Sequence, residues 1–179
     1  MESNKAALAA ADDAARRLTG RLRLPAGFYP VLAAAIAVQL AASAYGIAAQ
    51  TTVGLAIVLG GLVFFVAVAA LLLHAFRRIN GVSLDGLTGR VALAAGTLAG
   101  LAYPGALAIA IVAAFQSMWW LVAVAAIAGG VVCALGARQW WAAYRRSPAE
   151  HTAGPSPRML AALAIVGALG FVALMVVGS

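Results

Sequence analysis

Five residues within the long apolar stretches of this chain could line a path for a small molecule: Gln39, Ser43, Thr97, Tyr103 and Pro104. Gln39 and Ser43 lie four residues apart and therefore share one face of a helix. Pro104 removes one helical hydrogen bond and is expected to kink its helix. These residues predict either a path for an uncharged solute near Pro104 or hydrogen bonds between neighbouring helices, and we favour the hydrogen bonds.

No set of residues in the sequence has the spacing that is typical of a catalytic or metal-binding site. His74 lies at the end of an apolar stretch and His151 lies in a polar loop, whereas a metal centre needs three or four convergent ligands. Ser43, Ser117 and Ser156 have no histidine and acid at a recognisable spacing, and no glycine-rich phosphate loop or paired aspartate motif is present. We therefore expect no catalytic residue, no metal and no cofactor.

All charged residues lie outside the apolar stretches. Proton- and sodium-coupled transporters and voltage sensors use ionisable groups near the middle of the bilayer. The five acids of this chain all lie elsewhere, and so do its lysine and its arginines. This distribution argues against an ion-coupled transporter.

Composition and the length of the apolar stretches predict an all-α membrane protein with five transmembrane helices. The sequence has 179 residues, of which 65% are hydrophobic and 9% are charged, too few charges for the surface of a soluble domain. A helix needs roughly 20 apolar residues to cross the bilayer. The predicted spans are residues 28–49, 53–76, 91–114, 118–137 and 159–178. They form one transmembrane domain, residues 28–179, preceded by a cytoplasmic segment, residues 1–27.

The distribution of arginine and lysine predicts the orientation of these spans. Positive charge occurs before the first span, between the second and third, and around the connection from the fourth to the fifth. The connections at residues 49–52 and 115–118 carry no charge. Because short cytoplasmic loops are enriched in arginine and lysine, we expect an N-in, C-out protein. Eleven arginines against one lysine indicate a GC-rich bacterial genome, so we expect it in a bacterial cytoplasmic (inner) membrane.

The residues before the first span read as an amphipathic helix from Asn4 to Leu24 that lies on the membrane surface. Its arginines either bind anionic lipid headgroups or act only as a determinant of topology. Nucleic acid is not an expected partner, because the aromatic residues near the arginines fit the membrane interface better. The candidate anionic-lipid contacts along the whole chain are Arg16, Arg17, Arg21, Arg23, Arg77, Arg78, Arg145 and Arg146.

Small residues at a spacing of four predict close packing between helices. Gly96 and Gly100 form a GxxxG pair, and Ala42 with Gly46 is a second pair of small residues. Such pairs favour a homo-oligomer or a subunit of a membrane complex. Two tryptophan pairs, at residues 119–120 and 140–141, are about 31 Å apart along a helix and predict one aromatic anchor at each membrane interface.

The segments Arg16-Arg17-Leu18, Phe28-Tyr29-Pro30 and Arg77-Arg78-Ile79-Asn80-Gly81 resemble those of small multi-pass membrane proteins from GC-rich bacteria. That group has no assigned activity, so the resemblance implies no functional residue. We expect a non-catalytic accessory or assembly subunit of a membrane complex. The alternatives are an oligomeric channel or facilitator for an uncharged or amphipathic small molecule and, third, a lipid- or isoprenoid-modifying enzyme.

Overall fold

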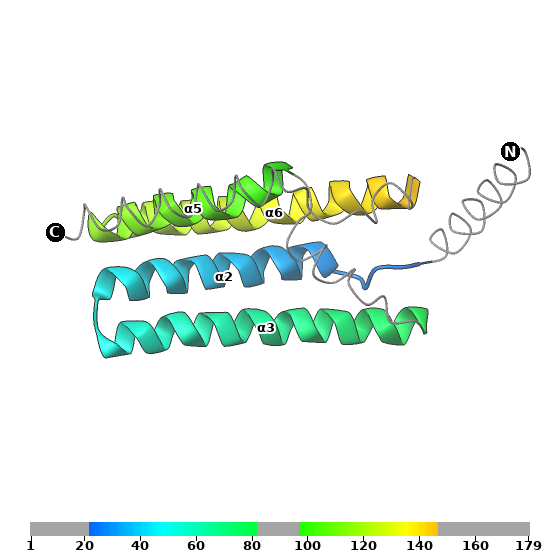
Figure 1. Ribbon diagram of the computed structural model, residues 1–179, viewed down its shortest axis with the longest axis horizontal. Coiled ribbons are helices and arrows are strands. Elements are labelled where there is room, and N and C mark those ends of the chain that lie inside the picture. Colours follow the sequence, from blue (N-terminus) through cyan, green and yellow to red (C-terminus); the bar gives the residue numbers. More distant parts are fainter. Residues whose placement is uncertain (1–21, 82–96, 147–179) are drawn as a thin grey trace, which may run out of the picture.

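The computed structural model describes residues 22–81 and 97–146 and folds them into four helices, with no strand in these ranges (Figure 1). The helices are α2 (Phe28–Ala49), α3 (Thr52–Asn80), α5 (Thr97–Phe115) and α6 (Trp119–Arg146). The predicted span at residues 159–178 lies outside the described residues, as do the first six residues of the span at 91–114.

Three of these helices, α2, α3 and α6, are long and apolar enough to cross a membrane. The apolar part of α5, Gly100–Phe115, is shorter. The prediction of an all-helical chain is therefore confirmed for the described residues, and three of their helices could cross a membrane. Five spans and the N-in, C-out orientation stay predictions.

The four helices form two antiparallel hairpins, and α2 is the central helix (Figure 1). It packs against α3, α5 and α6, and α5 also packs against α6. In contrast, α3 packs mainly against α2. The start of α2 and the ends of α3 and α6 lie at one end of the bundle, and the two short turns lie at the other (Figure 1).

Both short turns use a residue with left-handed backbone geometry that is not glycine. Gln50 has φ 49° and Ser117 has φ 57°. The Thr51 side chain caps α3 by accepting a hydrogen bond from the Gly54 N–H at 3.0 Å. After α5, the N–H groups of Ser117 and Met118 donate to the carbonyls of Ala114 and Ala113, which is the Schellman arrangement. These bonds satisfy the helix ends without a charged residue.

Glycines determine how closely α2 approaches its neighbours. A Cβ added at Gly46 would collide with the Gly54 carbonyl of α3, and one at Gly61 would lie 2.7 Å from the Ala42 Cβ. A Cβ at Gly130 of α6 would collide with the Ala33 carbonyl. The predicted pair of Ala42 and Gly46 thus lies on the face of α2 that packs against α3.

The segment before α2 corrects the predicted N-terminal helix. Leu22 to Pro25 are not helical, so an amphipathic helix cannot reach Leu24. Proline disfavours the helical conformation of the residue before it. In addition, the Asn80 side chain accepts a hydrogen bond from the Arg23 N–H at 2.8 Å and donates to the Arg23 carbonyl at 2.9 Å. The remainder of the predicted helix, with Arg16, Arg17 and Arg21, lies outside the described residues.

The two tryptophan pairs of α6 have different surroundings. Trp119 and Trp120 are exposed, as expected of an interfacial anchor. Trp140 and Trp141 are buried instead, and they lie within α6, which continues past the predicted end at Ala137 as far as Arg146. The Trp141 ring lies 6.3 Å from the Phe76 ring of α3 and 5.9 Å from the Tyr144 ring. Trp141 therefore joins α6 to α3.

Candidate functional site

Polar side chains of α2 and α5 meet inside the bundle. The Gln39 amide donates to the Ser43 hydroxyl at 3.1 Å, and the Tyr103 hydroxyl donates to the Gln39 side-chain carbonyl. Ser43 is buried, whereas Gln39 and Tyr103 are half-buried. The structure therefore brings together three of the five residues that the sequence suggested for a solute path.

The side chains of this polar cluster are hydrogen-bonded to one another. Each side chain uses a donor or an acceptor on another member, and no buried side-chain nitrogen or oxygen in residues 22–81 and 97–146 lacks a hydrogen-bond partner. A hydrogen bond that joins two helices in a membrane contributes about 0.6 kcal/mol. The arrangement supports the interpretation that these residues connect α2 to α5.

The other sequence-predicted residues of this region lie on α5 or before it. Pro104 lies within α5, and the helix continues on both sides of it. Thr97 is the first residue of α5, and its side chain is outside the described part. Gly100 is half-buried on α5, and Gly96 lies outside the described residues. The GxxxG contact is therefore untested. Close contacts between helices are made at other glycines of the described residues: Gly46, Gly54, Gly61, Gly129 and Gly130.

All six arginines of the described residues lie toward one end of the bundle, where α2 begins and α3 and α6 end (Figure 1). They are Arg23, Arg77, Arg78, Arg138, Arg145 and Arg146. No aspartate or glutamate occurs in residues 22–81 or 97–146. This basic end is therefore strongly positive and suits anionic partners.

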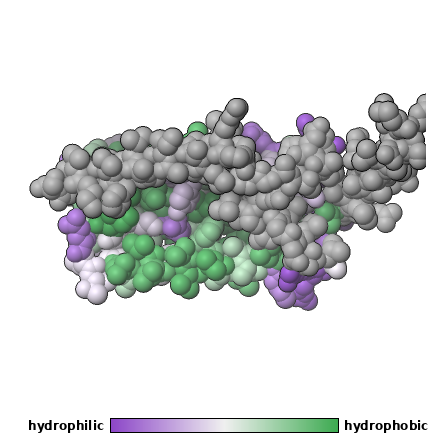
Figure 2. Space-filling model, viewed as in Figure 1, coloured by the Kyte–Doolittle hydropathy of each residue, from purple (hydrophilic) through white to green (hydrophobic). Residues whose placement is uncertain are grey.

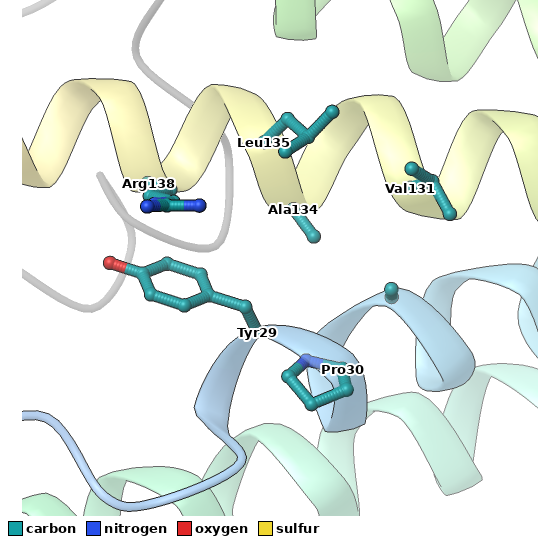
Figure 3. A pocket seen from close by; sticks show the side chains of 7 residues that line it. Tyr29, Pro30, Val131, Ala134, Leu135 and Arg138 are labelled. Atoms are coloured by element: carbon teal, nitrogen blue, oxygen red, sulfur yellow. The ribbon is translucent and has the colours of Figure 1, made fainter.

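A groove of about 460 Å³ lies between α2 and α6 at the basic end (Figure 3). It is lined by Tyr29, Pro30, Ala33, Val131, Ala134, Leu135 and Arg138, and we call it the α2–α6 groove. Its walls are apolar except at one end. There the Tyr29 hydroxyl and the Arg138 guanidinium come from opposite helices and lie near each other (Figure 3).

The α2–α6 groove was not predicted from the sequence. Arg138 entered the sequence argument only as a positive charge, and Tyr29 only as an aromatic residue at the membrane interface. Next to the groove, Gly130 of α6 lies against the backbone of Ala33. The small side chains of Ala33 and Ala134 line the groove and leave space between the two helices. Its volume lies within the range of about 300–1,000 Å³ that is typical of small-molecule sites.

Residues that would support metal or nucleophile chemistry do not gather in the described part of the chain. No three His, Cys, Asp or Glu side chains come together within residues 22–81 and 97–146. His74 is exposed on α3, and Cys133 is buried within α6.

Comparison with protein-family models, with characterised proteins and with solved structures found no match to this chain.

Proposed function

We propose that this chain is a non-catalytic accessory or assembly subunit of a membrane complex and that a transmembrane helix of the partner docks on α3. In this proposal the protein has five spans, is oriented N-in and C-out, and resides in a bacterial cytoplasmic membrane. The proposal rests on one observation: the outer face of α3 is exposed and carries small residues at a helical spacing.

That outer face has a regular stripe of mostly small residues. Every member is exposed, and the spacing alternates between four and three residues, so the residues share one side of the helix. The stripe consists of Ala56, Gly60, Val63, Ala67, Ala70 and His74, and we call it the outer stripe. It lies opposite the face with Gly54 and Gly61 that packs against α2. Small residues at this spacing let a second helix approach closely in a membrane.

The position of α3 in the bundle also supports a partner there. Of its 29 residues, α3 buries three, whereas α6, with 28 residues, buries eleven. Figure 2 shows an apolar surface along the middle of α3 and a hydrophilic surface at its basic end. A Cβ at Gly60 would have nothing within 4 Å, so space for a partner side chain or backbone is open at this position of the outer stripe.

The charge distribution supports the proposed orientation. The basic end carries the arginines, and the opposite end carries the uncharged residues Gln50, Thr51, Gln116 and Ser117. Arginine-rich ends stay in the cytoplasm during membrane insertion. A topology reporter inserted within residues 147–157 should be read in the cytoplasm, and one fused after Ser179 should be read outside. The opposite pattern would refute the orientation.

Affinity purification of the full chain at native abundance, in a mild detergent, tests the subunit proposal. The expected result is recovery of a stoichiometric membrane partner. Gly60→Ile should reduce recovery of that partner at least about 10-fold, because a large side chain would fill the contact. The matched control is Gly105→Ile on α5, since Gly105 is also exposed and has nothing within 4 Å of its Cβ position.

Three results would contradict this proposal. Failure to recover any stoichiometric partner would reject the subunit role. An equal decrease in partner recovery with Gly60→Ile and Gly105→Ile would reject the outer stripe as the docking face. Movement of a solute into liposomes that contain only this protein would favour the channel or facilitator instead.

A further inference from the structure

We propose that the α2–α6 groove binds one anionic glycerophospholipid. Its phosphate would contact the Arg138 guanidinium and the Tyr29 hydroxyl, and the upper part of one acyl chain would lie along the apolar walls. This site is separate from the outer stripe of α3, so the inference does not depend on the proposed function.

The depth of Arg138 in the bilayer fits a phosphate. From Trp119 to Arg138 there are 19 residues, or about 28 Å of helix rise. Trp119 is exposed at the opposite end, as an interfacial tryptophan would be. Because the hydrocarbon layer is about 30 Å thick, Arg138 reaches the headgroup level when Trp119 lies at the other interface.

The shape of the α2–α6 groove fits an acyl chain better than a soluble anion. Val131 and Arg138 line it seven residues apart on α6, so it extends about 10 Å from the headgroup level toward the bilayer centre. The other walls are apolar and have no side-chain hydrogen-bond donor for a soluble phosphate; they include Pro30, Ala33 and Leu135. A ligand with a charged head and an apolar tail matches both parts of the groove.

The electrostatics of the groove select negative charge. Within residues 22–81 and 97–146 no carboxylate is available to neutralise Arg138. Arg145 also lies close enough to interact electrostatically with the Tyr29 hydroxyl. A guanidinium can donate two parallel hydrogen bonds to a phosphate, and the tyrosine hydroxyl adds a third donor. Arg138 differs from the other arginines of the basic end because it lines the groove.

Native mass spectrometry of the full chain in a non-ionic detergent tests the site. The probes are palmitoyl-oleoyl phosphatidylglycerol and phosphatidylcholine with the same chains, titrated separately. We expect one phosphatidylglycerol to bind at concentrations at which phosphatidylcholine does not. Arg138→Gln should weaken this binding at least about 10-fold beyond Arg146→Gln. Both variants remove one positive charge, so the general attraction to anionic lipid falls equally, about fivefold, in both.

A second pair of variants tests the apolar part without changing charge. Val131→Phe places a larger side chain at the groove and should weaken phosphatidylglycerol binding at least about 10-fold. Val132→Phe is the control, since Val132 is similarly exposed, at 43% against 45% for Val131, but does not line the groove. Circular dichroism and size-exclusion chromatography check that each variant is folded.

Three outcomes would overturn the inference. The first is equal affinity for the two lipids. The second is equal loss in Arg138→Gln and Arg146→Gln, which would indicate general attraction to the basic end. The third is unchanged binding in Val131→Phe, which would show that no acyl chain occupies the groove.

Discussion

Replacement of Gly130 by alanine should destabilise the protein, whereas the same replacement at Gly60 should not. At Gly130 the new Cβ would collide with the Ala33 carbonyl and lie 3.3 Å from the Ala37 Cβ. A backbone carbonyl cannot rotate away as a side chain can, so α2 and α6 would have to separate. At Gly60 a Cβ meets nothing within 4 Å. Both positions are inside long helices, so the comparison isolates the contact between α2 and α6.

The magnitude follows from two opposing terms. Alanine is favoured over glycine within a helix by about 0.5–1 kcal/mol, and this gain applies to both variants. Overpacking of a close contact costs about 1–3 kcal/mol and applies to Gly130→Ala alone. The free energy of unfolding of Gly130→Ala should therefore lie about 1–3 kcal/mol below that of Gly60→Ala.

Reversible unfolding in mixed micelles of a mild detergent and sodium dodecyl sulfate, followed by circular dichroism, measures this difference. Gly60→Ala should be as stable as the parent protein or more stable. Gly130→Ala should unfold at a lower fraction of sodium dodecyl sulfate. If the two alanine variants unfold together, the close approach of α6 to Ala33 is wrong.

Three further predictions concern individual hydrogen bonds and one turn. Tyr103→Phe removes the bond to Gln39 and should lower the free energy of unfolding by about 0.6–1.7 kcal/mol in the same micelle assay, and no change would mean that the polar cluster does not stabilise the bundle. Asn80→Ala removes both hydrogen bonds to the Arg23 backbone, so trypsin should cleave after Arg23 at least about 10-fold faster in limited proteolysis. An unchanged cleavage rate would mean that these two bonds do not hold the segment before α2 against α3. Ser117→Gly should raise the free energy of unfolding by up to about 1 kcal/mol, because glycine adopts positive φ without a steric penalty, and a loss of stability would contradict the left-handed geometry of Ser117.

Some details of the helices were predictable because they depend on neighbouring residues alone. Ala49, the last residue of α2, is also the predicted end, because the polar residues Gln50 and Thr51 follow it. Gly81 ends α3 with φ 66°, and its N–H donates to the Arg77 carbonyl, as expected of a glycine after a helix. The end of α6 was less predictable, because the sequence marks where apolar residues stop and not where helical hydrogen bonding stops.

The candidate sites were predictable only in part. The spacing of Gln39 and Ser43 placed them on one face, but Tyr103, which donates to Gln39, is 64 residues away from it in sequence. The α2–α6 groove joins Tyr29 to Arg138, which are still farther apart. A local pattern does not contain the rotation of one helix against another, so neither meeting could be read from the sequence.

Sequence patterns alone were enough to predict that residues 22–81 and 97–146 are mainly helical, that some of their helices are able to cross a membrane, and that the apolar parts of these helices contain no charged residue. These properties follow from the free-energy cost of placing charges and unpaired backbone groups in hydrocarbon. That cost applies to each segment separately, so it does not depend on how the helices pack. Three features became visible only in the folded bundle: α2 is the central helix, glycines such as Gly54 and Gly130 lie where helices pack closely, and Arg138 faces Tyr29. Lipid tails are as apolar as the side chains that they replace, so hydrophobicity does not choose between helix faces. Close packing and a few hydrogen bonds make that choice.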